Sequence, residues 1–133
     1  MTDLMEAART VRENAYAPYS GFKVGAAVRS PSGAIYTGCN VENAAYPQGQ
    51  CAEAGAIANM IASGDTAIIE IAVIGNGNQP CPPCGGCRQR LREFAHPGTP
   101  IHMAGAEGGY LHQTLAELLP HSFGPEWLEG ERQ

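Results

Sequence analysis

Lysine is almost missing from this chain, which has 133 residues and a single lysine, Lys23. Charged residues make up 16% of the sequence, and the formal net charge is −5. Polynucleotide-binding proteins normally carry a basic stripe, because phosphate neutralisation supplies most of their affinity. The composition therefore argues against a nucleic-acid partner. If the ligand is nucleotide-like, we expect a small, uncharged molecule.

Long hydrophobic runs are missing as well. No apolar run approaches the roughly 20 residues that cross a bilayer. The first fourteen residues carry five charges and so lack the uninterrupted apolar stretch of a signal peptide. We therefore expect no membrane partner and a cytoplasmic location.

The length and the apolar content predict one ordered domain. Apolar residues make up 44% of the chain, as in globular proteins. A chain of this size buries about two-thirds of the surface that its unfolded form exposes. We expect residues 1–133 to form a single domain.

The hydrophobic pattern predicts alternating helices and strands. Residues 52–62 are apolar nearly all round, which is typical of a buried helix. Thr114 and Glu117 have the spacing of a capping box at a helix start. The resulting order is that of a three-layer α/β domain. The expected helices span 3–15, 52–62, 84–95 and 114–119, and the expected strands span 22–29, 34–40, 67–74, 101–104 and 110–113.

Cysteine is the residue type that points to chemistry. The chain has five cysteines, three of them within seven residues: Cys39, Cys51, Cys81, Cys84 and Cys87. An odd number and this clustering favour thiols or metal ligands over disulfides.

Cys51, Cys84 and Cys87 have the spacing of a zinc site. Cys84 and Cys87 lie three residues apart at an expected helix start, so they share a helix face and can chelate together. Cys51 opens the other helix and supplies a third ligand. Thiols at helix starts have lowered pKa values and bind metal more readily. Three ligands leave one open position on a tetrahedral zinc, as catalytic zinc sites do.

Glu53 is the expected proton shuttle of this site. It follows Cys51 by two residues, about 200° around a helix, so it cannot easily bind the same metal but can point into a pocket beside it. Three thiolates on Zn²⁺ leave a net negative charge. We expect Arg88, next to Cys87, to offset part of that charge by folding back onto sulfur. The four histidines lie outside the motifs, and we expect them at the surface or at an interface: His96, His102, His112 and His121.

Cys81 leaves two other readings open. Cys81, Cys84 and Cys87 resemble the start of an iron–sulfur run, with Cys51 as a remote fourth ligand. That run would place its next cysteine at position 91, which is leucine. Alternatively, Cys81 closes a four-cysteine structural zinc site in a binding or scaffold domain.

The chain resembles the small cytidine deaminases over nearly its full length. The resemblance rests on five blocks in the family's order. They are Pro18 to Ala27 (PYSGFKVGAA), Gly38 to Pro47 (GCNVENAAYP), Cys51-Ala52-Glu53, Pro83 to Gln89 (PCGGCRQ), and the C-terminal segments 117–120 (ELLP) and 122–125 (SFGP).

The resemblance implies a fold, a reaction and an assembly. The fold is an α-β-α sandwich with a mixed sheet of about five strands. The reaction is the hydrolytic deamination of cytidine and deoxycytidine to uridine and deoxyuridine, with release of ammonia, in pyrimidine salvage. It uses one Zn²⁺ per subunit, held by Cys51, Cys84 and Cys87. Relatives of this length are homotetramers with active sites shared between subunits, and Tyr46 matches a residue that reaches a neighbouring site.

The resemblance also implies individual roles. Glu53 takes a proton from zinc-bound water, the hydroxide attacks C4 of the cytosine ring, and Glu53 protonates N3 and then the leaving amine. Asn40 and Glu42 match residues that bind the sugar hydroxyls, and Phe22 matches a ring that packs on the pyrimidine. Ala44 and the backbone of Ala52 line the base pocket.

Two positions depart from the family pattern. Most relatives have an arginine after the glutamate, where this chain has Ala54. The usual Ser-Pro-Cys is Pro82-Pro83-Cys84 here. Both changes concern rate and substrate range. A deaminase of an aminonucleoside antibiotic such as blasticidin S remains the alternative, although the block around Asn40 and Phe22 favours a plain nucleoside.

Overall fold

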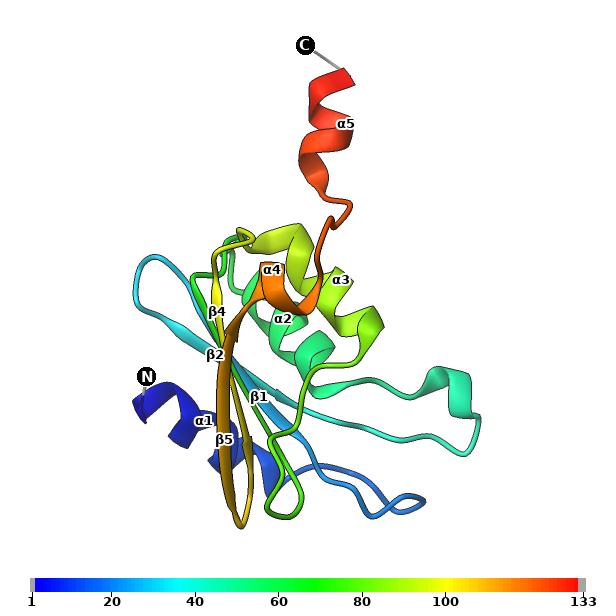
Figure 1. The fold of residues 1–133 in the computed structure, drawn as a ribbon. Coiled ribbons are helices and arrows are strands. Elements are labelled where there is room, and N and C mark those ends of the chain that lie inside the picture. Colours follow the sequence, from blue (N-terminus) through cyan, green and yellow to red (C-terminus); the bar gives the residue numbers. More distant parts are fainter. Residues whose placement is uncertain (1, 132–133) are drawn as a thin grey trace.

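A five-stranded mixed sheet lies at the centre of the computed structural model, which describes residues 2–131 (Figure 1). Its strands are β1 (Gly25–Arg29), β2 (Ile35–Cys39), β3 (Glu70–Gly75), β4 (Pro100–Gly105) and β5 (Gly108–Thr114). The order across the sheet is β2-β1-β3-β4-β5, and only the β3–β4 pair is parallel among the strands of the described residues. The predicted mixed sheet of about five strands is confirmed.

Helices cover both faces of the sheet. They are α1 (Thr2–Arg12), α2 (Ala52–Ala62), α3 (Gly85–Phe94), α4 (Leu115–Leu118) and α5 (Pro125–Glu131), with a 3-10 turn, η1 (Tyr46–Gln48). α1 packs on one face, while α2, α3 and α4 lie on the other (Figure 1). The three-layer α-β-α arrangement is therefore confirmed. No helix between residues 2 and 131 is long and apolar enough to cross a membrane.

The central strand β3 contributes to two separate cores. Ile71 and Val73 face α2 and α3, whereas Ala72 and Ile74 face α1, and all four side chains are buried. This alternation follows from the two-residue period of a strand. It confirms that the apolar run of β3 is covered on both faces.

Gly38 lets α2 lie close against β2. A Cβ atom at this position would be 2.3 Å from the backbone nitrogen of Ala56 and 2.5 Å from the carbonyl oxygen of Ala52. Only glycine fits such an approach without displacing backbone. Since α2 begins directly after Cys51, this contact fixes the position of the first metal ligand.

The bounds of several elements differ from the expected ones. The strand predicted from residue 22 begins at Gly25, because the side chain of Asn40 replaces its ladder partners. The Asn40 Oδ1 accepts from the Val24 N–H at 2.9 Å, and its Nδ2 donates to the Phe22 carbonyl at 2.8 Å. The helix predicted over 3–15 ends at Arg12.

The C-terminal part contains the predicted capping box and a helix that was not predicted. Thr114 and Glu117 form the predicted capping box at the start of α4. Helix α5 was not predicted. Its signals are Pro125 at the first helical position and Glu126 in the first turn, two residue types that favour helix starts.

Candidate metal centre and substrate pocket

Two helix N-termini bring three cysteines together. Cys51 is the N-cap of α2, Cys84 is the N-cap of α3, and Cys87 lies in the first turn of α3. Their sulfur atoms all lie within 4.8 Å of one another. A tetrahedral zinc with Zn–S bonds of about 2.3 Å separates its sulfurs by roughly 3.8 Å, so this cluster fits one zinc ion.

The local sequence explains why both cysteines stand at helix starts. Pro83, which is buried, precedes Cys84 and has no N–H to donate. The carbonyl of Cys84 then accepts the first bond of α3, from the Arg88 N–H at 3.0 Å. The carbonyl of Cys51 accepts in the same way from the Gly55 N–H at 3.1 Å.

The three thiols differ in the direction in which their pKa values are shifted. Burial raises the pKa of Cys51 and of Cys87 above the usual value for a thiol. A hydrogen bond from the backbone N–H of Cys87 lowers the pKa of Cys84. Because thiolates are the metal-binding form, zinc binding must displace protons from the thiols of Cys51 and Cys87.

Cys81 does not join this cluster. Its sulfur is not part of the three-sulfur group found among residues 2–131, and burial raises the pKa of its thiol to about 11. The geometry therefore disfavours both the iron–sulfur arrangement and the four-cysteine zinc site. Cys81 instead lines the pocket beside the cluster, together with Glu53.

The carboxylate of Glu53 points into a pocket next to the sulfurs, as expected. Its side chain is only 4% exposed, and burial raises the pKa of the carboxyl group above its usual value. The pocket has a volume of about 190 Å³. Its lining residues are Val24, Asn40, Cys51, Ala52, Glu53, Cys81, Pro82 and Cys84.

Asn40 and Ala52, two predicted substrate contacts, belong to this pocket. The amide of Asn40 is bound to the backbone of Phe22 and Val24, which gives it a structural role in the pocket wall. The Phe22 ring is half-exposed. It lies beside Cys81 over Gly75, because a Cβ on Gly75 would be 3.1 Å from the Phe22 Cε1 and 2.9 Å from the Cys81 Sγ.

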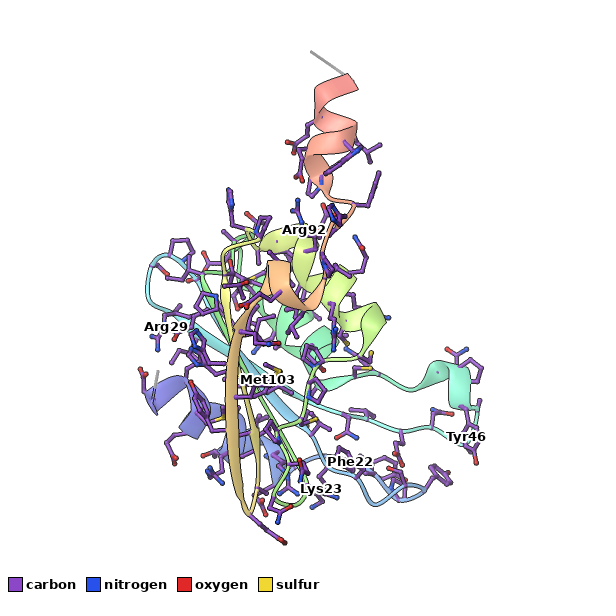
Figure 2. All side chains as sticks on the ribbon, in the orientation of Figure 1. Phe22, Lys23, Arg29, Tyr46, Arg92 and Met103 are labelled. Carbon is purple, nitrogen blue, oxygen red and sulfur yellow. The ribbon has the colours of Figure 1, made fainter. Side chains whose placement is uncertain are left out.

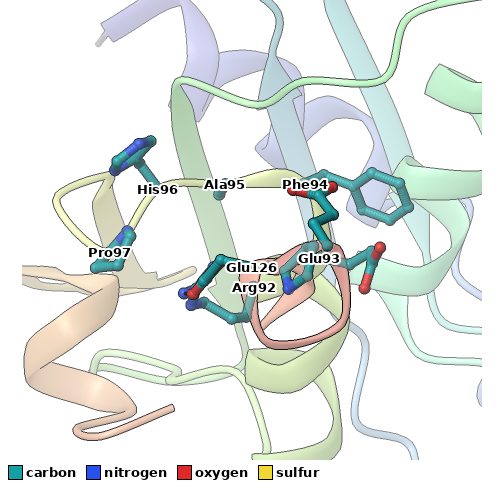
Figure 3. A pocket seen from close by; sticks show the side chains of 9 residues that line it. Arg92, Glu93, Phe94, Ala95, His96, Pro97 and Glu126 are labelled. Carbon is teal, nitrogen blue, oxygen red and sulfur yellow. Dashed lines mark hydrogen bonds and ion pairs between the residues drawn. The ribbon is translucent and has the colours of Figure 1, made fainter. Parts of the chain in front are cut away.

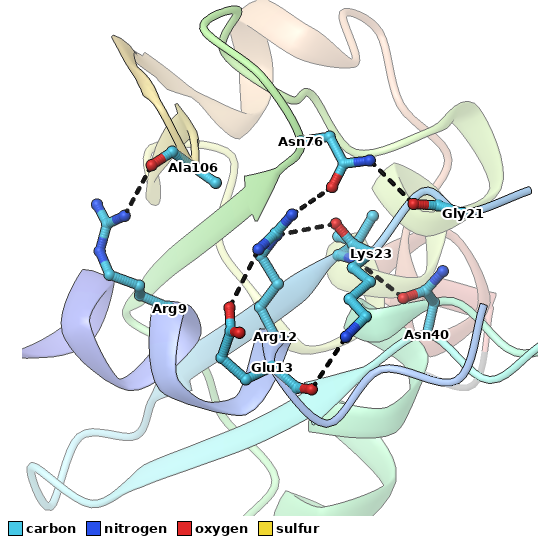
Figure 4. A network of polar contacts seen from close by, with 9 residues as sticks. Arg9, Arg12, Glu13, Gly21, Lys23, Asn40, Asn76 and Ala106 are labelled. Atoms are coloured by element: carbon cyan, nitrogen blue, oxygen red, sulfur yellow. Dashed lines mark hydrogen bonds and ion pairs between the residues drawn. The ribbon is translucent and has the colours of Figure 1, made fainter. Parts of the chain in front are cut away.

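Hydrogen bonds from Arg12 of α1 reach the segment that precedes Val24, a residue of the pocket wall (Figure 4). Arg12 donates through Nε to the carbonyl of Lys23 at 3.1 Å and through Nη2 to the Asn76 Oδ1. Asn76 in turn donates to the carbonyl of Gly21 at 3.1 Å. Arg12 and Asn76 were not predicted to belong to the site, since nothing in the local sequence links residues 64 positions apart.

Glu42 and Tyr46 line a second hollow, of about 370 Å³. Glu42 accepts hydrogen bonds from the backbone N–H groups of Tyr19 and Ser20 and from the Ser20 hydroxyl. The hydrogen bond from Ser20 lowers the pKa of Glu42. Figure 2 shows Tyr46 at the far end of the loop that carries η1. Ala44 is exposed and lines neither hollow.

Comparisons with known proteins agree with this site. Residues 1–103 match the family model described as the cytidine and deoxycytidylate deaminase zinc-binding region. A cytidine deaminase of Sporosarcina psychrophila is 39% identical, with 94% of this chain and 92% of the relative covered. A crystal structure of cytidine deaminase from Burkholderia pseudomallei is 41% identical and superposes with a TM-score of 0.87, with 92% of this chain and 98% of that chain covered.

The chain belongs to the cytidine and deoxycytidylate deaminase family. It is a deaminase, a hydrolase that uses Zn²⁺, and the predicted family is confirmed. A cytidine deaminase of Halalkalibacterium halodurans, 38% identical over 92% of this chain and 93% of the relative, gives the same result.

Two expectations about Arg88 and His102 of this deaminase are wrong. Arg88 does not fold back onto sulfur, because its guanidinium donates to the carbonyls of Pro83 at 2.8 Å and Leu118 at 2.7 Å. His102 is buried, not at the surface. Its Nε2 is 2.8 Å from the Glu70 carboxylate and its Nδ1 is 2.6 Å from the Tyr110 hydroxyl.

A further pocket lies between the end of α3 and α5, and it contains none of the deaminase cysteines (Figure 3). Arg92, which is buried, pairs with Glu126 there and donates to the Ser122 hydroxyl at 2.8 Å. These contacts fix the segment that leads into α5. The charged residues of this pocket therefore serve to attach α5 to α3.

Proposed function

We propose that this protein catalyses the hydrolytic deamination of cytidine and deoxycytidine. Water adds at C4 of the cytosine ring and ammonia leaves, which gives uridine or deoxyuridine. The observation that supports this proposal best is the shared pocket. Glu53, Cys51 and Cys84 line the same small cavity.

Cys51, Cys84 and Cys87 would hold the zinc ion. With three protein ligands, zinc keeps an open position and supplies the Lewis acidity that makes water a nucleophile at neutral pH. The N-terminal ends of α2 and α3 lie at Cys51 and Cys84, and their helix dipoles would offset part of the negative charge of the thiolates.

Glu53 would be the catalytic residue that moves protons. It takes one proton of the attacking water and delivers it to N3 of the ring, then takes the proton of the new C4 hydroxyl group and passes it to the departing amine. A carboxyl group suits this task when burial raises its pKa towards neutrality. Its burial in the pocket supports the assignment.

The remaining predicted residues would hold the nucleoside. Ala52 and Phe22 stand around the metal pocket, which supports a place for the base. Asn40 lines the same pocket and stays the proposed contact of a sugar hydroxyl. Glu42 and Tyr46 line the neighbouring hollow, which supports a place for the sugar and for a partner subunit. Ala44 stays a proposed contact of the base pocket, although no contact described above supports it.

We also propose a homotetramer with shared active sites, acting in the cytoplasm in pyrimidine salvage. Exposed aromatic side chains support an assembly, since Tyr46 is 78% and Trp127 is 55% exposed. Five free cysteines support a reducing compartment. Residues 1–133 would form its single domain.

The test is ammonia release from cytidine and deoxycytidine by the purified protein, beside the Glu53→Gln variant. We expect steady release by the parent and a loss of several orders of magnitude in the variant, with zinc content unchanged. Near-normal turnover by the variant would remove Glu53 from its role. A zinc-loaded parent that releases no ammonia from either nucleoside would overturn the substrate assignment and make blasticidin S the next compound to test.

A further inference from the structure

The zinc site carries an excess of negative charge that the cysteines cannot balance. Three thiolates on a divalent ion leave a net charge of −1, and the Glu53 carboxylate lies in the same pocket. Uncompensated charge is costly away from water. A cation near the sulfurs would therefore favour the thiolate forms and strengthen metal binding.

Two arginines of α3 stand near the cluster, and they differ in what they bind. The Arg88 guanidinium donates hydrogen bonds to the backbone carbonyls of Pro83 and Leu118. Arg90, by contrast, donates through its Nη1 to the Cys87 Sγ at 3.6 Å. This is a hydrogen bond from a permanent cation to a metal-ligand atom.

Small side chains leave Arg90 room to reach the sulfur. Arg90 follows Cys87 by three residues, so the two share one face of α3. A Cβ on Gly86 would already lie 3.4 Å from the Arg90 Nη1. Ala54, on α2, lines the same groove between α2 and α3 as Arg90. A larger side chain at position 54 would compete for this space.

We propose that Arg90 is a positioning residue of the zinc site. Its guanidinium orients the sulfur of Cys87 and offsets the excess negative charge of the thiolates, in the space that Ala54 leaves open. The inference rests on the proposed three-cysteine coordination. It assigns to Arg90 the charge compensation that the sequence had suggested for Arg88.

Zinc affinity tests this role without reference to turnover. The parent, Arg90→Gln, Arg90→Lys and the control Arg9→Gln would be compared by chelator competition with zinc. Arg9 lies on α1, across the sheet from the cluster, and binds the Ala106 carbonyl. We expect Arg90→Gln to bind zinc about tenfold more weakly, as is typical when a partner of a metal ligand is removed. Arg90→Lys should lie between the two, because it keeps the charge.

Cobalt supplies a second readout. The absorption band that arises from sulfur-to-cobalt charge transfer should shift in Arg90→Gln and stay unchanged in Arg9→Gln, because only Arg90 contacts a ligand sulfur. Introducing Ala54→Arg into Arg90→Gln should restore most of the zinc affinity, since it returns a guanidinium to the same groove. If Arg90→Gln keeps the parent's cobalt spectrum and its zinc affinity within roughly twofold, Arg90 has no such role. A parent that binds no zinc would instead overturn the coordination itself.

Discussion

The side chain of Asn40 pairs with Val24 in place of a neighbouring strand: its Oδ1 accepts the Val24 N–H at 2.9 Å. The same amide donates to the carbonyl of Phe22. One side chain thus closes the wall of the metal pocket where the β1–β2 pairing ends.

Removing this amide should loosen the pocket wall. We expect Asn40→Ala to lower the free energy of unfolding by about 1–3 kcal/mol, because it removes two hydrogen bonds to backbone groups. It should also raise KM for cytidine. Urea denaturation and steady-state kinetics would measure both effects. Asn59→Ala is the control, since Asn59 makes only a 3.5 Å exposed bond to the Thr37 carbonyl; an equal effect at both positions would contradict the role of Asn40.

Zinc stoichiometry should separate Cys81 from the ligands. Cys81→Ser should keep one zinc per chain, because the Cys81 sulfur lies outside the three-sulfur group. Cys84→Ser should lose it, because two remaining thiolates cannot hold zinc comparably. Elemental analysis of the purified variants would decide. Loss of zinc in Cys81→Ser would return the four-cysteine site to consideration.

A methyl group at Gly38 should displace α2. The added Cβ would lie 2.3 Å from the Ala56 backbone nitrogen. We expect Gly38→Ala to cost about 1–3 kcal/mol or more in unfolding free energy, and to weaken zinc binding because Cys51 moves with α2. Gly85→Ala is the matched control, because a Cβ there has no neighbour within 4 Å. Thermal unfolding with and without zinc would check both variants, and an unaffected Gly38→Ala would contradict the close approach.

The stability of the protein should decrease in acid partly through His102 and Glu70. Burial lowers the pKa of His102 from 6.5 despite the adjacent carboxylate. Burial alone would raise the pKa of Glu70. Hydrogen bonds from Arg29 and His102 outweigh this effect and lower the pKa below 4.5. With both pKa values lowered, the unfolded chain binds more protons than the folded one, so stability is lost as the pH falls through the folded values.

Substitutions of His102 and Glu70 should show that each residue affects stability in its own pH range. His102→Gln should flatten the curve of unfolding free energy against pH just below pH 6.5, the unfolded value of histidine. Glu70→Gln should flatten it below pH 4.5. Urea titrations at a series of pH values would show this. Zinc loss in acid is common to all three proteins, so the differences between their curves isolate the two groups, and parallel curves would contradict the assignment.

The parts of the site that could be predicted from the sequence are local in the chain. Cys84 and Cys87 lie within one helical turn, and Cys51 and Glu53 stand at one helix start, so residue spacing was sufficient. Contacts between distant segments were not predictable in this way. The choice between Arg88 and Arg90 depends on where α4 places the Leu118 carbonyl.

Glu42 illustrates the same limit of local sequence. Its carboxylate accepts hydrogen bonds from the backbone of Tyr19 and Ser20, more than twenty residues earlier, and no local pattern predicts this contact. The α5 helix was missed because it spans only seven residues, too few for a clear hydrophobic period.

The placement of Cys51 and Cys84 at two helix starts makes the metal a cross-link between distant parts of the chain. The intervening segment spans 84 − 51 = 33 positions. Closing such a loop costs the unfolded chain conformational entropy, so the ligand set exists only in the folded state. Folding and metal loading are therefore thermodynamically linked. Once zinc is in excess over its dissociation constant, each tenfold rise in free zinc should add about 1.4 kcal/mol to the unfolding free energy, so metal supply governs the stability of this deaminase as well as its chemistry.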